Sequence, residues 1–564
     1  MRLLYTPPRT GGGRGMVFPF SNVSSKILAR KKTVKQKQSL REWSFDETIK
    51  FWTKKITNYG RAGELQKSMK VFREMPHRNQ VSWNSMLTVL LKANRLEGAR
   101  RLFDEMPQRN SVSYTLMLAA LSSSGFVSEA RELFDSMPIS QQNVFSWTAM
   151  ISCYFQNRHP LCALELFSSL YDDFFFLKII PNSYTFTVLV KSCLDLEALT
   201  TATQIQALIV KLLDDNKESV FVQNSLIDLY SKLGILADAE KIFWLLKWKH
   251  LSSWNIMMAA YAHHLLIDKA FGIFSSMGEK DTLSWNIMIS GFSEIGCSAK
   301  ALELFLQLTR SQQPQTEPNS STYTIILTVC TTYCMLEMGR QVHTCTIKRG
   351  LHGSNAYAGN ALINMYARCG MVKESEQVFG EMPNRDVISW NSMILGLGQN
   401  GYCRKALEVG EKALECHVYN QSTFIGLLQS CSYGGLVDEG LKYFTSMSTK
   451  YCIEPTLDHY ICAIDMLARA GKIVEAHSLL LEMPFAANAI TWEALLSGCM
   501  LHGNEEVGEI AAYQLRSLEP CNVASYVMLA NIYRQTGRLE ESNWLFSLMN
   551  EIGLKKELGC SWVV

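Results

Sequence analysis

The side chains best suited to chemistry form a row of Asn and Thr that recurs along most of the chain. The polar residue usually follows a Trp or Tyr and lies in an otherwise apolar stretch. Amides and hydroxyls at a regular spacing can hydrogen-bond the Watson–Crick edges of unpaired nucleobases. A helix cap or a hydrogen bond between neighbouring segments is the structural alternative. The row consists of Thr53, Asn84, Thr115, Thr148, Asn224, Asn255, Asn286, Asn360 and Asn391.

A second polar row stands where each repeated segment ends, and its choice of residue is just as narrow. These residues precede the next helix, so they are also candidates for helix N-caps, and both roles are compatible. The second row consists of Asn79, Asn110, Asn143, Asn182, Asp281, Asn319, Asp386 and Asn420.

The sequence contains none of the catalytic motifs that we considered. A zinc-dependent base deaminase needs H-x-E and C-x-x-C, but none of the eleven His precedes a Glu by two positions and no two of the sixteen Cys are spaced C-x-x-C. No phosphate loop, H-E-x-x-H motif or nucleophile elbow is present either. We therefore predict no catalytic residue, no metal site, no cofactor and no enzymatic activity.

The two rows belong to a repeated pair of amphipathic helices. The segment VSWNSML (81–87) returns as FSWTAMI (145–151), and RLFDEMPQRN (101–110) returns as QVFGEMPNRD (377–386). Apolar residues recur at helical spacing in both segments. One such hairpin cannot bury its apolar faces alone, so neighbouring repeats must stack. The sequence thus predicts an all-α solenoid.

The repeats divide the chain into a lead-in of residues 1–48, thirteen repeats over 49–488, two further repeats over 489–556, and a tail of residues 557–564. In this register the first row is the fifth place of each repeat and the second row is its last place. The expected repeats are 49–79, 80–110, 111–143, 144–182, 183–219, 220–250, 251–281, 282–319, 320–355, 356–386, 387–420, 421–456, 457–488, 489–522 and 523–556.

Repeats of 31, about 35 and about 36 residues in recurring triplets resemble the plant PLS class of pentatricopeptide-repeat proteins. The long-type repeats are 183–219, 320–355 and 421–456, where GRQVHTCTIKRG (339–350) is especially similar to that class. Residues 489–564 resemble its E1 and E2 motifs, with ITWEALLSGCMLHGNEEVGEIAA and YVMLANIYRQTGRLEES. The resemblance implies a right-handed α-solenoid superhelix of the E subgroup, without a DYW deaminase domain.

The resemblance also implies how RNA is recognised. In that family the fifth and last residues of one repeat form a base-reading pair. Thr with Asn favours adenine, Asn with Asp favours uracil, and Asn with Asn favours pyrimidines. The second place contacts the faces of the bases, and here it is mostly apolar: Val81, Val112, Phe145, Phe221, Leu283 and Ile388.

The family also suggests a function and partners. We expect a site-recognition factor that binds single-stranded organellar RNA and directs C-to-U editing. Residues 489–564 would recruit a DYW-type deaminase or other editing-complex proteins. A splicing or RNA-stability factor is the alternative. A protein-binding scaffold of tetratricopeptide type is a third possibility, but its repeats keep to 34 residues.

Three departures weaken the base assignments. His250 is the last residue of the repeat that contains Asn224, where the family pattern has Asn or Asp. Ile461 is an apolar residue at a fifth place, where a polar residue is expected. An insertion around residues 171–176 is expected either to bulge out or to shift the phase of its repeat.

Charge is unevenly spread. Of 55 basic residues, ten lie in residues 1–41, which have no acidic residue; the other 45 accompany 52 acidic residues, a net charge of −7 over 42–564. The repeats therefore lack the excess of basic residues that would bind RNA through its phosphates, so base contacts should matter more than phosphate contacts.

The basic N-terminal segment is typical of an organellar transit peptide, mitochondrial more than chloroplastic. A basic tail that contacts RNA is the alternative. No apolar run approaches the roughly 18 residues of a membrane helix.

Two recurring residue types are expected to be structural. Cys193, Cys330, Cys431 and Cys499 share the eleventh place of their repeats, which suggests a small buried slot. Trp residues at the fourth place are either core or a platform for stacking bases.

Overall fold

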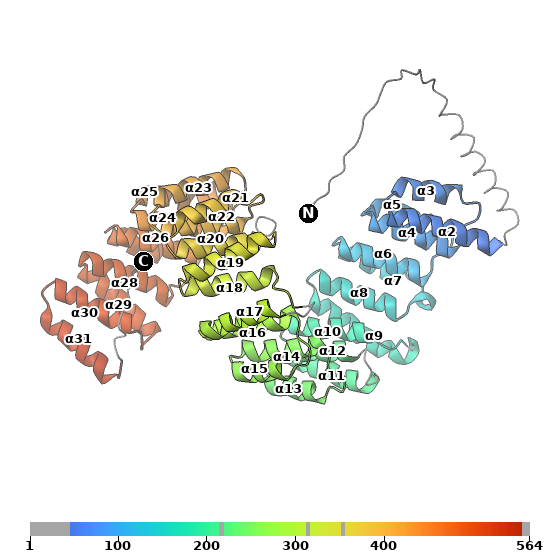
Figure 1. Ribbon diagram of the computed structural model, residues 1–564, viewed down its shortest axis with the longest axis horizontal. Helices are drawn as coiled ribbons and strands as arrows, with labels where there is room; N and C mark the ends of the chain where they lie inside the picture. Colours follow the sequence, from blue (N-terminus) through green and yellow to red (C-terminus); the bar gives the residue numbers. More distant parts are fainter. Residues whose placement is uncertain (1–44, 178, 214–218, 312–315, 351–355, 555–564) are drawn as a thin grey trace, which may run out of the picture. The chain divides into compact units, whose positions relative to one another are not determined.

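The computed structural model describes residues 45–177, 179–213, 219–311, 316–350 and 356–554, and the regular elements within these ranges are helices (Figure 1). Residues 1–44 of the expected transit peptide and the tail 557–564 lie outside the described residues. Helices with even labels are the first helices of the repeats, and helices with odd labels are the second helices.

The described residues up to His250 form one part of the chain and those from Leu251 onward form another. The first part contains α2 (Phe45–Arg61), α3 (Leu65–Glu74), α4 (Gln80–Lys92), α5 (Leu96–Asp104), α6 (Ser111–Ser123), α7 (Val127–Asp135), the short 3₁₀ helix η1 (Ile139–Gln141), α8 (Val144–Gln156), α9 (Pro160–Leu177), α10 (Ser183–Asp195), α11 (Leu199–Leu212), α12 (Ser219–Lys232) and α13 (Leu236–Leu245).

The second part contains α14 (Leu251–His263), α15 (Ile267–Ser276), α16 (Thr282–Glu294), α17 (Ser298–Arg310), α18 (Ser320–Thr332), α19 (Leu336–Lys348), α20 (Ala356–Arg368), α21 (Val372–Glu381), α22 (Val387–Gln399), α23 (Cys403–Glu415), α24 (Gln421–Gly434), α25 (Val437–Thr449), α26 (Leu457–Arg469), α27 (Ile473–Glu482), α28 (Ala489–His502), α29 (Glu505–Leu518), α30 (Val523–Gln535) and α31 (Leu539–Glu551).

Within each part the helical hairpins stack, so that each first helix packs against its own second helix and against the first helix of the next repeat. This is the all-α solenoid that the sequence predicts. No helix among the described residues is long and apolar enough to cross a membrane.

The starts of the first helices are set by side-chain caps. In a typical case, the Oδ1 atom of Asn110 accepts a hydrogen bond from the backbone N–H of Ser113 at 3.0 Å, and the backbone N–H of Asn110 donates to the Ser113 hydroxyl at 2.9 Å. This capping box satisfies backbone groups that a helix start leaves without partners.

An Arg that follows the helix contacts the end of several second helices, namely α3, α5 and α21. Arg109 donates from Nε to the carbonyl oxygen of Phe103 at 3.1 Å, and its guanidinium lies 4.5 Å from the centre of the Phe103 ring. Arg385 makes the same two contacts with Phe379, at 2.8 and 4.7 Å. The cation therefore caps the last carbonyls of the helix and also covers an apolar ring.

The fourth-place Trp residues belong mainly to the core. Trp147, Trp390 and Trp492 are buried. Trp147 meets Phe134 of the preceding second helix edge to face, with 5.0 Å between ring centres, and Trp390 meets Phe379 in the same way. These aromatic pairs join consecutive repeats.

The eleventh-place Cys residues are fully buried, as expected. Burial raises the pKa of Cys193 and Cys330 to about 11 and that of Cys431 and Cys499 to about 12. These thiols therefore stay protonated and behave as small apolar side chains. The described residues hold no cluster of three or more metal-ligating side chains.

The insertion at residues 171–176 neither loops out nor displaces the next repeat. Helix α9 runs without interruption from Pro160 to Leu177, and α10 begins at Ser183 after its own cap, Asn182. The extra residues lengthen the second helix of this repeat.

His459 replaces the small hydroxyl residue that usually stands at the third place. It is fully buried; Nε2 donates to the carbonyl oxygen of Gln421 at 2.9 Å, and Nδ1 accepts from the backbone N–H of Thr456 at 3.1 Å. Nδ1 also lies 2.7 Å from the Thr456 hydroxyl, and the tautomer of the ring decides which of these two groups donates. Burial, partly offset by the bond to Gln421, lowers the pKa of His459.

This histidine should make stability depend on pH. The unfolded chain takes up a proton at the ordinary pKa of about 6.5, while the folded ring takes one up only at a lower pH, so stability falls as the pH drops below about 6.5. Replacing His459 with Ser, the residue type used elsewhere, should reduce the loss of Tm between pH 7.5 and 5.5. Thermal unfolding by circular dichroism measures this, and an equal loss in parent and variant would contradict it.

Candidate nucleic-acid interface

The fifth-place residues lie on the first helices, one turn from the exposed second place. The second-place side chains are strongly exposed, for example 61% for Val81 and 64% for Phe145. The fifth-place Asn side chains are much more enclosed, with exposed fractions of 4% for Asn255 and 5% for Asn360. Apolar surface thus alternates with recessed polar groups along this face.

Five Asn residues of the fifth place are hydrogen-bonded to the last residue of their own repeat. In each pair the Asn Nδ2 group donates to the amide or carboxylate oxygen of the partner. The pairs are Asn84–Asn110 at 3.2 Å, Asn255–Asp281 at 3.1 Å, Asn286–Asn319 at 3.4 Å, Asn360–Asp386 at 3.1 Å and Asn391–Asn420 at 3.1 Å.

The partners in these pairs are also N-caps. Asp386 accepts from the backbone N–H of Ser389 at 2.8 Å, and Asp281 accepts from that of Ser284 at the same distance. One side chain, that of the last residue, therefore both caps the next helix and accepts a hydrogen bond from the fifth-place Asn. The fifth and last residues of a repeat thus meet at its junction with the next repeat. Asn79, Asn143 and Asn182 cap α4, α8 and α10 in the same way.

The Thr residues of the fifth place behave differently. Thr53, Thr115 and Thr148 each donate to a carbonyl oxygen four residues earlier in their own helix, at 2.8, 2.7 and 2.6 Å. Their Asn partners keep the capping bond, and no hydrogen bond joins the two members of these pairs in the described part of the chain. In these repeats the Asn Nδ2 group is not committed to the fifth residue.

The two Asp residues of the row are held in their charged form. Burial raises the pKa of each carboxyl, but hydrogen bonds to Asp281 from Ser284 and Asn255, and to Asp386 from Ser389 and Asn360, outweigh burial and lower the pKa below its ordinary value. An ionised carboxylate only accepts hydrogen bonds. It therefore suits a base edge that presents an N–H group.

The oxygen of the fifth-place Asn has two kinds of environment. In Asn255, Asn286 and Asn391 it accepts from a Ser or Thr hydroxyl at the third place of the next repeat, at 2.7 to 2.8 Å. In Asn84 and Asn360 the oxygen is buried and has no protein partner among the described residues. These bonds from the third-place hydroxyls were not predicted from the sequence, although Ser or Thr recurs at the third place of most repeats.

Two departures from the pattern are visible in the structure. Asn224 is buried, whereas His250 at the last place is exposed. Ile461 lies half-buried on the face that carries the row. The second place also includes Tyr184, Tyr357 and Ile490, which are 57%, 68% and 61% exposed. These three residues could have been identified from the sequence, because each is the second residue of its expected repeat.

Comparison with protein families gives two matches. The model described as PPR repeat matches residues 56–79, 81–111, 112–140, 145–172, 224–251, 252–282, 283–312, 360–387, 388–418 and 458–485. The model described as E motif matches residues 502–564.

The chain belongs to the pentatricopeptide-repeat family. Its repeats and E motif fit the E subgroup of the PLS class. Among curated relatives from Arabidopsis thaliana, a chloroplastic pentatricopeptide repeat-containing protein is 36% identical over 74% of this chain and 44% of its own length. A mitochondrial relative is 34% identical over 75% of this chain and 60% of its own length. The chain therefore spans about half the length of these relatives.

A solved structure has the same fold. The pentatricopeptide repeat protein PPR10 from maize matches 94% of this chain and 77% of its own, with 19% sequence identity and a TM-score of 0.55. PPR10 has also been crystallised with an 18-nt psaJ RNA element, and that form gives a TM-score of 0.42.

The shared cap predicts how this pentatricopeptide-repeat protein responds to changes at Asp386. Asp386→Ala removes the acceptor for the Ser389 N–H, so it should lower the free energy of unfolding by about 1 kcal/mol, whereas Asp386→Asn keeps a capping oxygen and should cost only a fraction of that. Urea unfolding of both variants measures the difference. Equal destabilisation would show that the cap is not what Asp386 contributes to stability.

Proposed function

We propose that this protein binds single-stranded RNA in a sequence-specific manner and acts as a site-recognition factor for C-to-U editing of organellar transcripts. The observation that carries the proposal is the row of preformed pairs at the repeat junctions. Most of these pairs present amide or carboxylate groups beside an exposed apolar or aromatic second-place side chain, such as Val81, Leu283, Tyr357 or Ile388. This combination can hold a base by its face and its edge. Family membership supports the same use.

The base choices follow from the donors and acceptors of each pair. An ionised Asp beside Asn, as in Asn360–Asp386, offers acceptors to the N3–H group of uracil. In a pair such as Thr115 with Asn143, the Asn Nδ2 group is not committed to Thr and can donate to N1 of adenine. The Asn oxygen is used in the helix cap, but the Thr115 hydroxyl oxygen can still accept from the adenine N6–H group. The net charge of −7 over residues 42–564 favours such base contacts over phosphate neutralisation.

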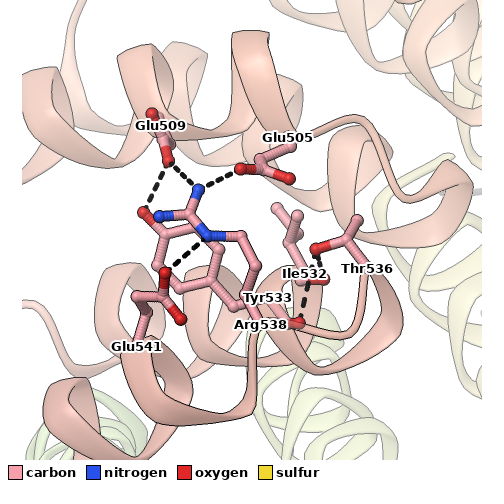
Figure 2. A network of polar contacts seen from close by, with 7 residues as sticks. All are labelled: Glu505, Glu509, Ile532, Tyr533, Thr536, Arg538 and Glu541. Atoms are coloured by element: carbon pink, nitrogen blue, oxygen red, sulfur yellow. Dashed lines mark hydrogen bonds and ion pairs between the residues drawn. The ribbon is translucent and has the colours of Figure 1, made fainter.

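The two C-terminal repeats are proposed to dock protein. Arg538, in the turn between α30 and α31, binds Glu505 and Glu509 of α29 and Glu541 of α31 (Figure 2). The guanidinium lies 4.5 Å from the centre of the Tyr533 ring, whose hydroxyl donates to Glu509 at 2.7 Å. Burial and the Glu509 carboxylate raise the pKa of Tyr533 to about 12.

This network ties three helices into one block whose second helices expose large side chains. Tyr513 of α29 is 68% exposed and Trp544 of α31 is 60% exposed. Exposed aromatic residues on a rigid support are typical of protein interfaces. We assign to this block the recruitment of a DYW-type deaminase or another editing-complex protein, with the chemistry supplied by that partner.

Organellar targeting is part of the proposal. The acid-free, Arg-rich start is typical of a transit peptide, and the relatives include chloroplastic and mitochondrial proteins. We place the protein in the mitochondrion, with the chloroplast as the alternative. A splicing or stability factor is the second candidate, because tight occupancy of a transcript by the same pairs would also protect or remodel it.

The base assignment predicts that mutation of one pair changes the base that its repeat prefers. Changing Asn360 to Thr and Asp386 to Asn together should convert the preference of that repeat from uracil to adenine, since the double acceptor becomes one donor and one acceptor. A mismatched edge should cost about 1–3 kcal/mol, because a buried polar group is left unpaired. Competition between two RNAs that differ only at this base measures it; if parent and variant rank them identically, these residues do not read a base.

The editing role predicts a defined molecular phenotype. Plants lacking the protein should lose C-to-U conversion at one or a few organellar sites, each a few nucleotides beyond the segment that the repeats bind. Sequencing of organellar RNA from mutant and wild-type plants measures this. Intact editing together with an unspliced or missing transcript would favour the splicing or stability role instead.

A further inference from the structure

A pocket of about 300 Å³ opens on the first helices after the last of the base-reading pairs. It is lined from α24, α26, α28 and α30. Its lining includes the fifth-place residues Ile461 and Glu493, and Gln429, Asp465 and Ser497 one turn further along their helices. Residues four apart share one face of a helix, so the pocket lies on the face that carries the fifth-place row.

The two carboxylates of this pocket differ in their partners. Asp465 accepts from Arg469 Nε at 2.8 Å and from the Ser432 hydroxyl at 2.8 Å. Glu493 is half-buried and has no hydrogen-bond or ion-pair partner in the described part of the chain. Asp465 is therefore satisfied by the protein, while both oxygens of Glu493 are available to a ligand that brings donors.

The remaining walls suit a flat, apolar-faced ligand. Ile461, Ile490 and Met528 come from three successive first helices and line the same pocket. Ile490 is 61% exposed and occupies the second place, where the other repeats present apolar side chains. A nucleobase can lie against such side chains while its edge meets a polar group.

Glu493 also stands apart from the fifth-place Asn residues. It cannot donate a hydrogen bond, so it cannot form the pair that Asn360 forms with Asp386. The last residue of its repeat, Asn522, instead donates to Glu519 at 2.9 Å and caps α30. The base edge in this repeat would therefore meet a lone carboxylate.

We propose that this pocket binds a guanine base of the RNA, with the Glu493 carboxylate accepting hydrogen bonds from its N1–H and N2–H groups. The inference rests on the proposed RNA-binding function and assigns a base to a repeat that otherwise has only a protein-docking role. The other bases fit worse, because each places an acceptor beside its donor. That acceptor is N3 in cytosine, N1 in adenine and a carbonyl oxygen in uracil, and each would face a carboxylate oxygen.

The register places this guanine in the RNA. One repeat addresses one nucleotide, so the base opposite Glu493 is the third nucleotide after the one opposite the Asn391–Asn420 pair. Residues 421–456 and 457–488 span the two nucleotides between them.

The test uses the full-length chain and four RNAs that differ only at that third nucleotide. The parent should bind the guanine RNA roughly tenfold more tightly than the other three, as expected for charge-assisted hydrogen bonds in an enclosed site. Glu493→Ala should bring the four affinities close together. Glu482→Ala removes an exposed carboxylate from α27 outside the pocket and should keep the guanine preference. Circular dichroism checks that all three proteins have the same helix content.

Two further RNAs, which differ at the nucleotide opposite Asn360 and Asp386, separate this inference from the proposed function. If the parent discriminates at that nucleotide but not at the third one, the guanine assignment is wrong and RNA recognition stands. If it discriminates at neither, the proposed function fails as well. A guanine preference that survives Glu493→Ala would also overturn the role given to this carboxylate.

Discussion

The junction between two repeats depends on one side chain, the last residue of each repeat. In most repeats its oxygen accepts a backbone N–H at the start of the next first helix, as Asp386 does for α22 and Asn420 for α24. Short polar residues are the ones best suited to this role. The same few residues can also address the edge of a base. Helix initiation and the proposed base recognition thus impose compatible demands on one position, which is Asn or Asp in most repeats.

The fifth residue is tied to that junction. Where it is Asn, its amide donates to the capping residue, so the two polar groups are oriented before any ligand arrives. Preorganised groups lose less entropy on binding than mobile ones. Where it is Thr, the hydroxyl is satisfied within its own helix and the capping Asn keeps its Nδ2 group available. Two arrangements of the same junction therefore present different donors and acceptors, and this supports a code that depends on both residues.

The sequence predicted the architecture well, because periodic patterns and caps are local. Most first helices begin at the first residue of the expected repeat, with α12 one residue early and α2 four residues early. Burial of Cys193 and Cys431 also followed from their shared place. The hydrogen bond from Asn391 to Asn420 could not be predicted, since it joins groups 29 residues apart whose distance depends on helix packing. The expectation for residues 171–176 was wrong, since α9 runs through them without a bulge or a shift of phase. The length of a repeat shows that residues are inserted, but it does not show whether they extend a helix or leave it.

We propose that the order of the pairs along the chain sets the order of the bases that the protein selects along the RNA. Selection of RNAs from a random pool by the full-length protein, followed by sequencing, tests it most directly. With one nucleotide per repeat and the RNA running 5′ to 3′ along the chain, the enriched segment should follow A-Y-A-A-n-n-U-Y-n-U-Y, where Y is a pyrimidine and n is any base. Enrichment of a different order, or of no sequence at all, would contradict the account.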